Sequence, residues 1–265
     1  MKKFTIILLV IVFILPISAC SNKNTAKNSN EQNPKIEMKS LISKNNKNWK
    51  SKVKSTKVEY TQSAESLYPL IPKNLEDFKT LDSTVIEGTI LNLEEMYGAK
   101  NTATTKATIQ VNEIISGKEK VQGQIIHVIF RGGFTSVKDL YDGFADKARA
   151  NGATFDPESS EKVYIEYQDD PMPEIGSKII TGINPNRSDG FNDIYDKYLL
   201  ANGLGGKDSY SVSVPEYNIW IKAPNADKFI INNPELNKMK GADSENSLAQ
   251  QLNQLTVKFN SKYNK

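Results

Sequence analysis

The sequence predicts a mainly β fold of the α+β class: a small closed or partly open barrel with inserted short helices and a C-terminal helix. Segments in which polar and apolar residues alternate recur from about residue 85 onward. Glycine-containing turns separate these segments, as is typical of successive strands that pair with few open edges. The final segment instead repeats leucines at helical spacing.

The strand pattern occurs in six segments, at 85–93, 104–115, 124–130, 163–167, 178–183 and 210–221. In the second of these, Ala107, Ile109 and Val111 fall on one side of the strand, which we expect to face the core. Pro215 interrupts the last segment. Because proline cannot donate a ladder hydrogen bond, this strand should lie at an edge or across a bend.

Four segments favour helices. Residues 63–78 predict short helical turns, because prolines interrupt an otherwise helical spacing. Two inserted helices are expected at 137–150 and 193–201. A final helix is expected at 244–263, where apolar residues follow at i, i+4, i+7 and i+11, namely Leu248, Leu252, Leu255 and Phe259.

The N-terminus has the organisation of a secretory signal peptide. Lys2 and Lys3 precede an apolar run of twelve residues at 6–17. Such a run is too short to cross a hydrocarbon core of about 30 Å, which needs about twenty residues. A basic start, a short apolar stretch and small residues at the end predict a cleaved signal peptide over residues 1–19.

The segment Ile17-Ser18-Ala19-Cys20 resembles the lipobox of bacterial lipoproteins, and it contains the only cysteine of the chain. This resemblance implies cleavage before Cys20 and a diacylglycerol on its sulfur. Two or three acyl chains anchor a protein stably in a membrane. We therefore expect a protein anchored through membrane lipid on the extracellular face of the bacterial cell membrane. A separate signalling role for the released leader stays open.

Residues 20–61 are expected to form a flexible tether, rich in Lys and Asn, between the lipid and a single β-rich domain at 62–265. Residues 20–60 contain ten Lys against three Glu, whereas residues 61–265 contain 22 basic and 28 acidic residues. The basic tether is suited to anionic head groups. An AT-rich genome is an equally good explanation of its composition.

A resemblance to a known family rests on the order of three segments, STVIEGTILNLEE, TKATIQVNEIISGKEKVQGQIIHVIFRGG and EIGSKIITGI. This order resembles a family of uncharacterised Gram-positive bacterial lipoproteins. Their barrel is OB-like and similar to the N-terminal domain of tissue metalloprotease inhibitors. The similarity covers about residues 74–221 and implies an OB-like barrel without assigning any catalytic residue.

The residue counts exclude several chemistries. One Cys and one His, His127, cannot form a Cys-rich or His-rich zinc site. A Ser-His-Asp triad is possible only through His127, which lies within an apolar strand. General acid–base catalysis near neutral pH most often uses His. We therefore predict that the protein is not an enzyme and has no catalytic residue, no cofactor and no metal.

Acidic residues gather in loops. In the segment 184–196, an EF-hand alignment would place Pro185 and Arg187 at ligand positions, so that pattern fails. A different cation site using Asp189, Asp193 and Asp196 stays open, although a turn followed by a helix cap explains these residues better. The carboxylates of Asp169, Asp170 and Asp156 lie beside prolines, where we expect solvent to keep each pKa ordinary.

Five aromatic residues on or near predicted strands are candidates for a binding platform: Tyr164, Tyr167, Tyr210, Tyr217 and Trp220. Aromatic residues on strands also serve as core or cross-strand pairs, and this alternative stays open. The net negative charge of the domain argues against nucleic acid as a partner.

Together these patterns predict a membrane-anchored surface lipoprotein that is a non-enzymatic binding module for a protein, a peptide or a cell-wall glycan. The alternative is a cell-envelope hydrolase that acts through a pair of carboxylates. The sequence specifies neither the identity of the ligand nor the oligomeric state.

Overall fold

The computed structural model describes residues 34–62, 71–72, 74–186, 193–205, 208–238 and 248–264. The predicted signal peptide over residues 1–19 and the predicted lipidation site Cys20 lie outside these residues. The described part belongs to one unit that starts at Pro34. Within it, no helix is both long enough and apolar enough to cross a membrane.

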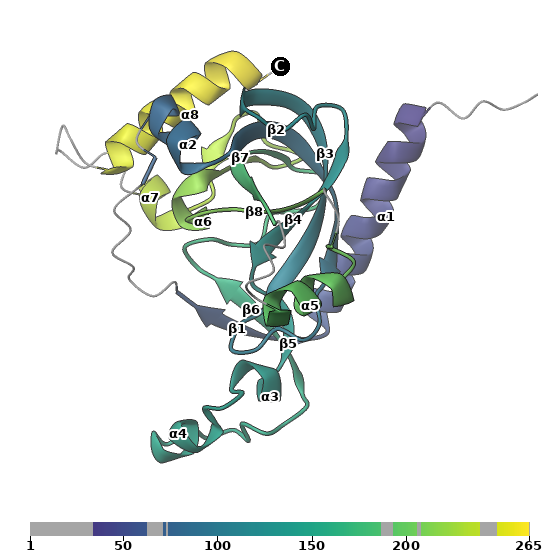
Figure 1. Cartoon of the computed structure of the whole chain (residues 1–265), viewed down its shortest axis with the longest axis vertical. Helices are drawn as coiled ribbons and strands as arrows, with labels where there is room; N and C mark the ends of the chain where they lie inside the picture. Colours follow the sequence, from purple (N-terminus) through teal and green to yellow (C-terminus); the bar gives the residue numbers. More distant parts are fainter. Residues whose placement is uncertain are drawn as a thin grey trace, which may run out of the picture. The chain divides into compact units, whose positions relative to one another are not determined.

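Five strands form a closed barrel (Figure 1). They are β2 (Thr84–Glu95), β3 (Thr104–Gly117), β4 (Ile125–Arg131), β7 (Lys178–Pro185) and β8 (Ser209–Ser211). β2 pairs with β3 and β7, and β3 pairs with β4. β8 closes the ring, because it pairs in parallel with β4 and antiparallel with β7. The barrel confirms the predicted fold class and is compatible with an OB-like fold.

Apolar residues fill the barrel. Because successive side chains of a strand point to opposite faces, every second residue of β3 from Ala107 to Val111 enters the interior. Three register shifts in β2 bend that long strand around the ring. The fully buried interior residues include Ile86, Ile90, Ile109, Ile126, Val128, Ile179 and Ile183.

Two strands extend the barrel sheet beyond β7, and helices cover their outer face. β9 (Ile219–Lys222) pairs with β7, and β10 (Ile230–Ile231) pairs with β9. α2 (Leu75–Leu81) and α8 (Leu248–Tyr263) pack against them, α7 (Pro234–Lys238) follows β10, and Asn74 caps α2. α8 confirms the predicted C-terminal helix from Leu248 onward, whereas residues 244–247 lie outside the described ranges.

The predicted strand at 210–221 is divided. β8 ends at Ser211, and Val214 takes a left-handed backbone conformation with φ 45°. α6 (Pro215–Asn218) then begins with a proline. Proline is favoured in the first turn of a helix because a backbone N–H at that position would have no acceptor within the helix. This break moves the chain from the barrel ring to the added strand β9.

A second sheet of three strands has the order β1-β6-β5. It consists of β1 (Lys57–Thr61), β6 (Lys162–Tyr167) and β5 (Gly133–Ser136), with β1 parallel and β5 antiparallel to β6. β5 follows β4 through Gly132 and Gly133, which have φ values of 87° and 113°. A Cβ added at Gly133 would collide with the Thr105 hydroxyl, so this bend requires glycine.

The insertion between β5 and β6 contains two short helices instead of the single helix predicted at 137–150. α3 (Val137–Leu140) and α4 (Ala145–Ala150) are separated by a turn in which Gly143 has φ 72°. A left-handed residue cannot continue an α-helix, which explains the break. The helix predicted at 193–201 is confirmed as α5 (Asp193–Ala201).

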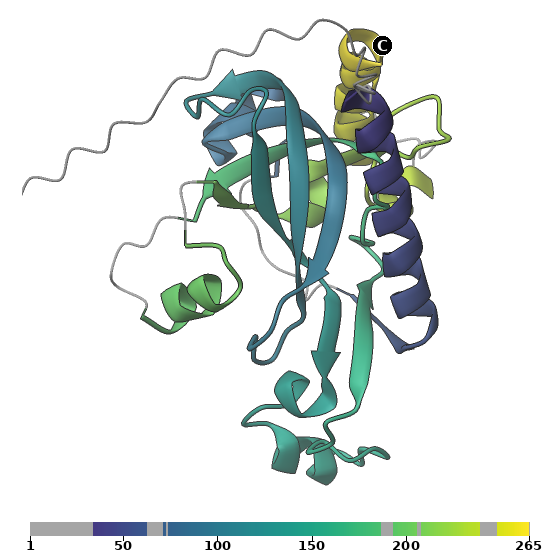
Figure 2. The same cartoon turned by 90° about the vertical axis from the view of Figure 1, so that its right-hand side faces the viewer.

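The predicted tether is shorter than its sequence suggests, because residues 34–61 form α1 (Pro34–Lys54) and β1. α1 lies along the unit and leads directly into β1 (Figure 2). The Asn45 amide donates a hydrogen bond to the Leu91 carbonyl at 3.0 Å, and Lys50 pairs with Glu174. The Trp49 ring lies 5.1 Å from that of Phe134. Contacts with distant residues therefore order a segment whose own composition favours disorder.

Candidate functional site

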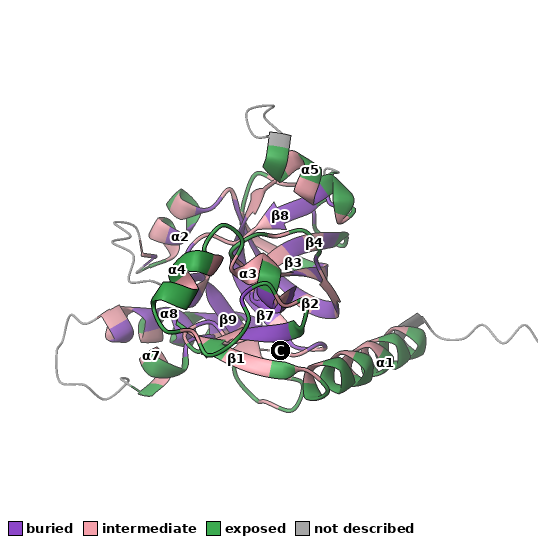
Figure 3. Cartoon of the chain, turned by 90° about the horizontal axis from the view of Figure 1, so that it is seen from below, coloured by how far each residue is buried: buried purple, intermediate pink, exposed green. Residues whose placement is uncertain are grey.

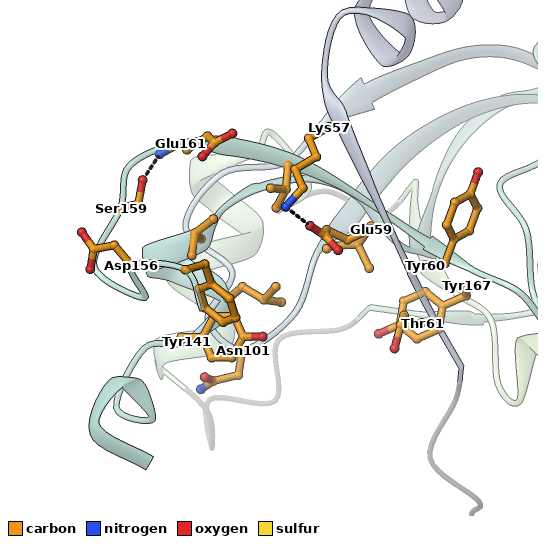
Figure 4. A pocket seen from close by; sticks show the side chains of 15 residues that line it. Lys57, Glu59, Tyr60, Thr61, Asn101, Tyr141, Asp156, Ser159, Glu161 and Tyr167 are labelled. Atoms are coloured by element: carbon orange, nitrogen blue, oxygen red, sulfur yellow. Dashed lines mark hydrogen bonds and ion pairs between the residues drawn. The ribbon is translucent and has the colours of Figure 1, made fainter. Parts of the chain in front are cut away.

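A cavity of ≈ 610 Å³ opens on one face of the three-stranded sheet (Figure 4). We call it the small-sheet cleft. Strands β1 and β6 form its floor, and α3 with the loop that leads into β6 forms its wall. Its lining residues are Lys57, Glu59, Tyr60, Thr61, Asn101, Val137, Leu140, Tyr141, Phe155, Asp156, Ser159, Glu161, Val163, Ile165 and Tyr167.

The strand register explains the composition of the floor. Lys57, Glu59 and Thr61 of β1 lie opposite Val163, Ile165 and Tyr167 of β6. Because alternate residues share a face, all six side chains are directed to the cleft side of the sheet. Val163 and Ile165 are buried, so the centre of the floor is apolar and its β1 side carries charge.

Aromatic side chains form the wall. The rings of Tyr141 and Phe155 lie 4.9 Å apart at an interplanar angle of 44°. Phe155 is 40% exposed although it is a large apolar residue, and Tyr141 is half-buried. A partly exposed aromatic pair beside an apolar floor provides a surface that a bound apolar group would cover.

The cleft is acidic at its rim. One lysine, Lys57, accompanies three carboxylates, those of Glu59, Asp156 and Glu161. The Lys57 ammonium lies 2.5 Å from the Glu59 carboxylate. This hydrogen bond, with the attraction of Glu59 and Glu161, raises the pKa of Lys57. The Arg149 guanidinium lies 3.9 Å from the Asp156 carboxylate, which leaves one carboxylate in excess at the rim. This excess favours ligands that carry positive charge.

A buried polar cluster lies behind the cleft. The Arg131 guanidinium covers the Tyr167 ring at 4.3 Å. It also lies 3.3 Å from the carboxylate of Glu216 and 3.6 Å from that of Asp170. The Asn232 amide donates to Asp170 at 3.1 Å. This cluster fixes the position of the Tyr167 ring and connects β4 and the loop after β6 to α6 and β10.

The prediction that Asp170 is solvated beside Pro171 is wrong, because only 4% of Asp170 is exposed. Burial raises its pKa to about 7, against the opposing effect of Arg131. The difference arises because Arg131 and Asn232, both distant in sequence, enclose the loop. Asp170 and Glu216 are therefore closed off from solvent and do not line the small-sheet cleft.

α1 covers the opposite face of the three-stranded sheet. The Trp49 ring packs edge-on against Phe134 and, at 6.2 Å, against Tyr164. Burial is the main cause that raises the pKa of the Tyr164 hydroxyl. α1 therefore covers much of this face, and a smaller cavity of ≈ 310 Å³ remains between α1 and β6.

The five predicted platform residues do not come together. Tyr164 is buried under Trp49, Tyr210 is buried in the barrel core, and Trp220 is fully buried beneath α8. The Trp220 indole donates to the Thr256 hydroxyl at 2.8 Å. Tyr217 packs at the edge of the same cluster. Only Tyr167 lines the cleft, so the alternative of core and cross-strand packing describes most of this set.

His127 lies on β4, and its Nδ1 is 3.2 Å from the Asp208 carboxylate. Among the described residues, no serine or threonine hydroxyl bonds to this imidazole. The acidic segment 184–196 is described only in part: Asp189 lies outside the described ranges, and α5 begins at Asp193. Over the residues that were placed, no group of three His, Cys, Asp or Glu side chains is arranged around a metal position.

Sequence reasoning singled out Tyr167 and Asp156 but missed most of the other residues that form the cleft. Lys57 and Glu59 fell within the predicted tether, although KVEYT alternates as a strand does. Tyr141 and Phe155 fell within an insertion and are fourteen positions apart in the chain. Their contact depends on the turn at Gly143 and on the loop that follows α4, neither of which has a local sequence signal for aromatic pairing.

The chain was compared with protein-family models, with curated proteins and with solved structures, and it matches none of them.

Proposed function

We propose that this protein is a Gram-positive surface lipoprotein, anchored through Cys20, whose ordered domain binds a ligand in the small-sheet cleft without catalysing a reaction. The observation that carries the proposal is the cleft itself, which combines an apolar floor, a partly exposed aromatic pair and an acidic rim. Concave sites with an apolar lining and a few polar groups are typical of binding sites.

A binding role is favoured over the alternative of a carboxylate-dependent hydrolase. Neither histidine nor cysteine is among the residues that line the cleft in the described part of the chain. The Ser159 hydroxyl accepts a hydrogen bond from the Glu161 N–H at 3.1 Å, so it is engaged in a local turn. The carboxyl pair of Asp170 and Glu216 is enclosed, whereas a glycosidase pair must reach its substrate.

Site-specific photo-crosslinking in intact cells tests this function. A benzoylphenylalanine replaces Tyr141 in the cleft or, as the control, Val257, which is 61% exposed on α8. We expect a saturable adduct from position 141 and none from position 257. Turnover of peptidoglycan or peptide substrates by the purified chain, or equal adducts from both positions, would contradict the proposal.

The anchor is tested separately. Cys20→Ser should abolish metabolic labelling by a palmitate analogue and leave the protein unprocessed or shed into the medium. The measurement is the label on the immunoprecipitated protein, with wild type as the control. Unchanged labelling of the variant would contradict a lipid on Cys20.

A further inference from the structure

β1 is an edge strand. In the part of the chain that the structure describes, it pairs with β6 on one side and with no other strand. The Thr61 carbonyl accepts a hydrogen bond from the Gln168 N–H at 2.9 Å, so the backbone groups of Thr61 face β6. Because these directions alternate along a strand, the N–H and C=O groups of Val58 and Tyr60 face the open edge.

This open edge borders the small-sheet cleft. Lys57, Glu59 and Thr61 direct their side chains to the cleft, and the backbone groups between them face outward. A strand added beside β1 would bond to Val58 and Tyr60. It would direct every second side chain to the cleft face, at intervals of about 6.6 Å. Peptides bound in this way take affinity from backbone bonds and specificity from alternate side chains.

The cleft determines which side chains would fit. Its rim keeps an excess of negative charge after Lys57 pairs with Glu59 and Arg149 with Asp156, so basic side chains are favoured there. Its wall presents the ring of Phe155, which is 40% exposed and lies against Tyr141, and this ring favours an apolar side chain. The complementary sequence therefore alternates a basic, an apolar and a basic residue at every second position.

We infer that the ligand is an extended peptide segment of another protein, which adds to β1 as a fourth strand and places a Lys/Arg–apolar–Lys/Arg face into the cleft. This inference rests on the proposed binding function and names its ligand class. It requires no conformational change in the barrel, because the open edge and the cleft both belong to the three-stranded sheet.

The first test uses synthetic peptides and the purified full chain. A fluorescent peptide of about seven residues covers the five residues of β1 and extends one residue beyond each end. It carries Lys at its second and sixth positions, Leu at the fourth and Thr elsewhere. We expect saturable binding by fluorescence anisotropy, at least about tenfold tighter than for the same peptide with Glu in place of Lys. Equal affinities, or no binding of either peptide, would overturn the inference.

Backbone pairing is tested by methylation of the peptide. Alternate N–H groups of an added strand face β1, whereas the others face solvent. Peptides N-methylated at odd positions and peptides N-methylated at even positions should therefore differ in affinity. One of the two series should bind about tenfold or more weakly than the unmethylated peptide. Equal loss or equal retention in both series would show that the peptide does not bind as a strand.

The matching protein variants are Val58→Pro and Val58→Ala. Proline removes the outward N–H and is tolerated at a strand edge, whereas alanine keeps this donor. Val58→Pro should weaken peptide binding about tenfold, and Val58→Ala less than about twofold. Circular dichroism verifies the fold. If Val58→Pro does not fold, Tyr60→Pro removes the second outward N–H.

The outcomes separate this inference from the function on which it rests. Position 141 could give a saturable adduct in cells while the peptides show no charge preference and no dependence on the position of methylation. The cleft would then bind another class of ligand, such as a glycan. If position 141 gives no adduct, the binding function itself fails. Dimers in sedimentation velocity that Val58→Pro dissociates would assign the edge to a second copy and overturn the inference.

Discussion

The five-stranded barrel and the three-stranded sheet differ in how their strand edges and faces are covered. Each barrel strand has a neighbour on both sides, and apolar side chains fill the interior. Among the described residues of the three-stranded sheet, β1 pairs with β6 alone, and α1 packs against one face. Figure 3 shows the same contrast, with the barrel strands largely buried and β1 intermediate to exposed.

This difference shows how one chain separates stability from recognition. Closure leaves no backbone edge in the barrel ring, so the barrel resists pairing with other chains. The smaller sheet keeps the backbone groups and apolar surface that a partner can cover. Changes in the barrel and its extension should therefore alter folding, and changes in the cleft should alter binding while folding is preserved.

The largest expected effect is that of Trp220→Ala, in the strand added to the barrel. The Trp220 side chain is fully buried between Phe78 and Phe259. We expect the free energy of unfolding in urea to fall by about 3–5 kcal/mol, because the substitution leaves a large cavity. As a control, Tyr60→Ala removes a ring that is 68% exposed. This variant should change the free energy of unfolding by less than about 0.5 kcal/mol. Reduced ligand binding of Trp220→Ala at unchanged stability would restore Trp220 as a binding residue.

The next effect concerns the buried cluster that joins the two regions. The pKa of Asp170 is about 7 in the folded chain, whereas the pKa of an aspartate in an unfolded chain is about 3.9. Between pH 4 and 7 the unfolded chain releases this proton while the folded chain retains it, so stability falls as pH rises through this window. Below pH 4 both states are protonated, and above pH 7 the loss is constant.

Asp170→Asn should remove this contribution, on the order of 2–4 kcal/mol between pH 4 and pH 8. Urea unfolding at both pH values measures the change, and Glu158→Gln, an exposed loop variant, is the control. Asp82, whose pKa burial also raises to about 7, keeps part of the pH dependence in the variant. An unchanged pH dependence would show that Asp170 is ionised in the folded protein.

A smaller, regional effect is expected for Trp49→Ala. Trp49 connects α1 to the back of the three-stranded sheet through Phe134 and Tyr164. Its loss should lower the free energy of unfolding by about 1–3 kcal/mol. It should also increase amide hydrogen exchange in α1, β1 and β6, while the barrel amides keep their protection. Equal loss of protection in β3 would show that the two regions unfold as one.

The smallest effect on stability is expected for Glu59→Gln. Its carboxylate is 45% exposed and pairs with a lysine that is 62% exposed, and such surface pairs contribute about 0–1 kcal/mol. The melting temperature should therefore change little, whereas binding of the Lys-containing peptide should weaken several-fold. Thermal denaturation and fluorescence anisotropy measure the two quantities. A large loss of stability would place Glu59 in the folding core instead.

The barrel could be predicted from the sequence because its signals are local. The alternation of Ala107, Ile109 and Val111 gives the inward face of β3, and the leucines of α8 give its buried stripe. The helix α1 could not be predicted in this way. Its composition is that of a soluble tether, and it is ordered by Phe134, Tyr164 and Glu174, which follow about a hundred residues later.

The cleft was missed for a similar physical reason. Its floor joins a strand near the start of the chain to one near the middle, and its wall comes from an inserted loop. The burial of Asp170 also depends on Arg131 and Asn232, which no local pattern associates with it. Only Tyr167 among the predicted aromatic residues lies in the cleft, because a strand pattern does not tell which face is left open.

The pairing of β1 with β6 has a consequence for the order of events during synthesis. Lys57 lies opposite Val163, so β1 leaves the ribosome 106 residues before its partner. Chain synthesis proceeds at about 5–20 residues per second, so about 5–20 s pass between the synthesis of β1 and that of β6. During this interval the barrel strands β2, β3 and β4 can already associate, whereas β1 has both edges uncovered. The charges of Lys57 and Glu59 discourage incorrect pairing in that interval. The floor of the cleft can therefore form only once the chain has been synthesised through β6.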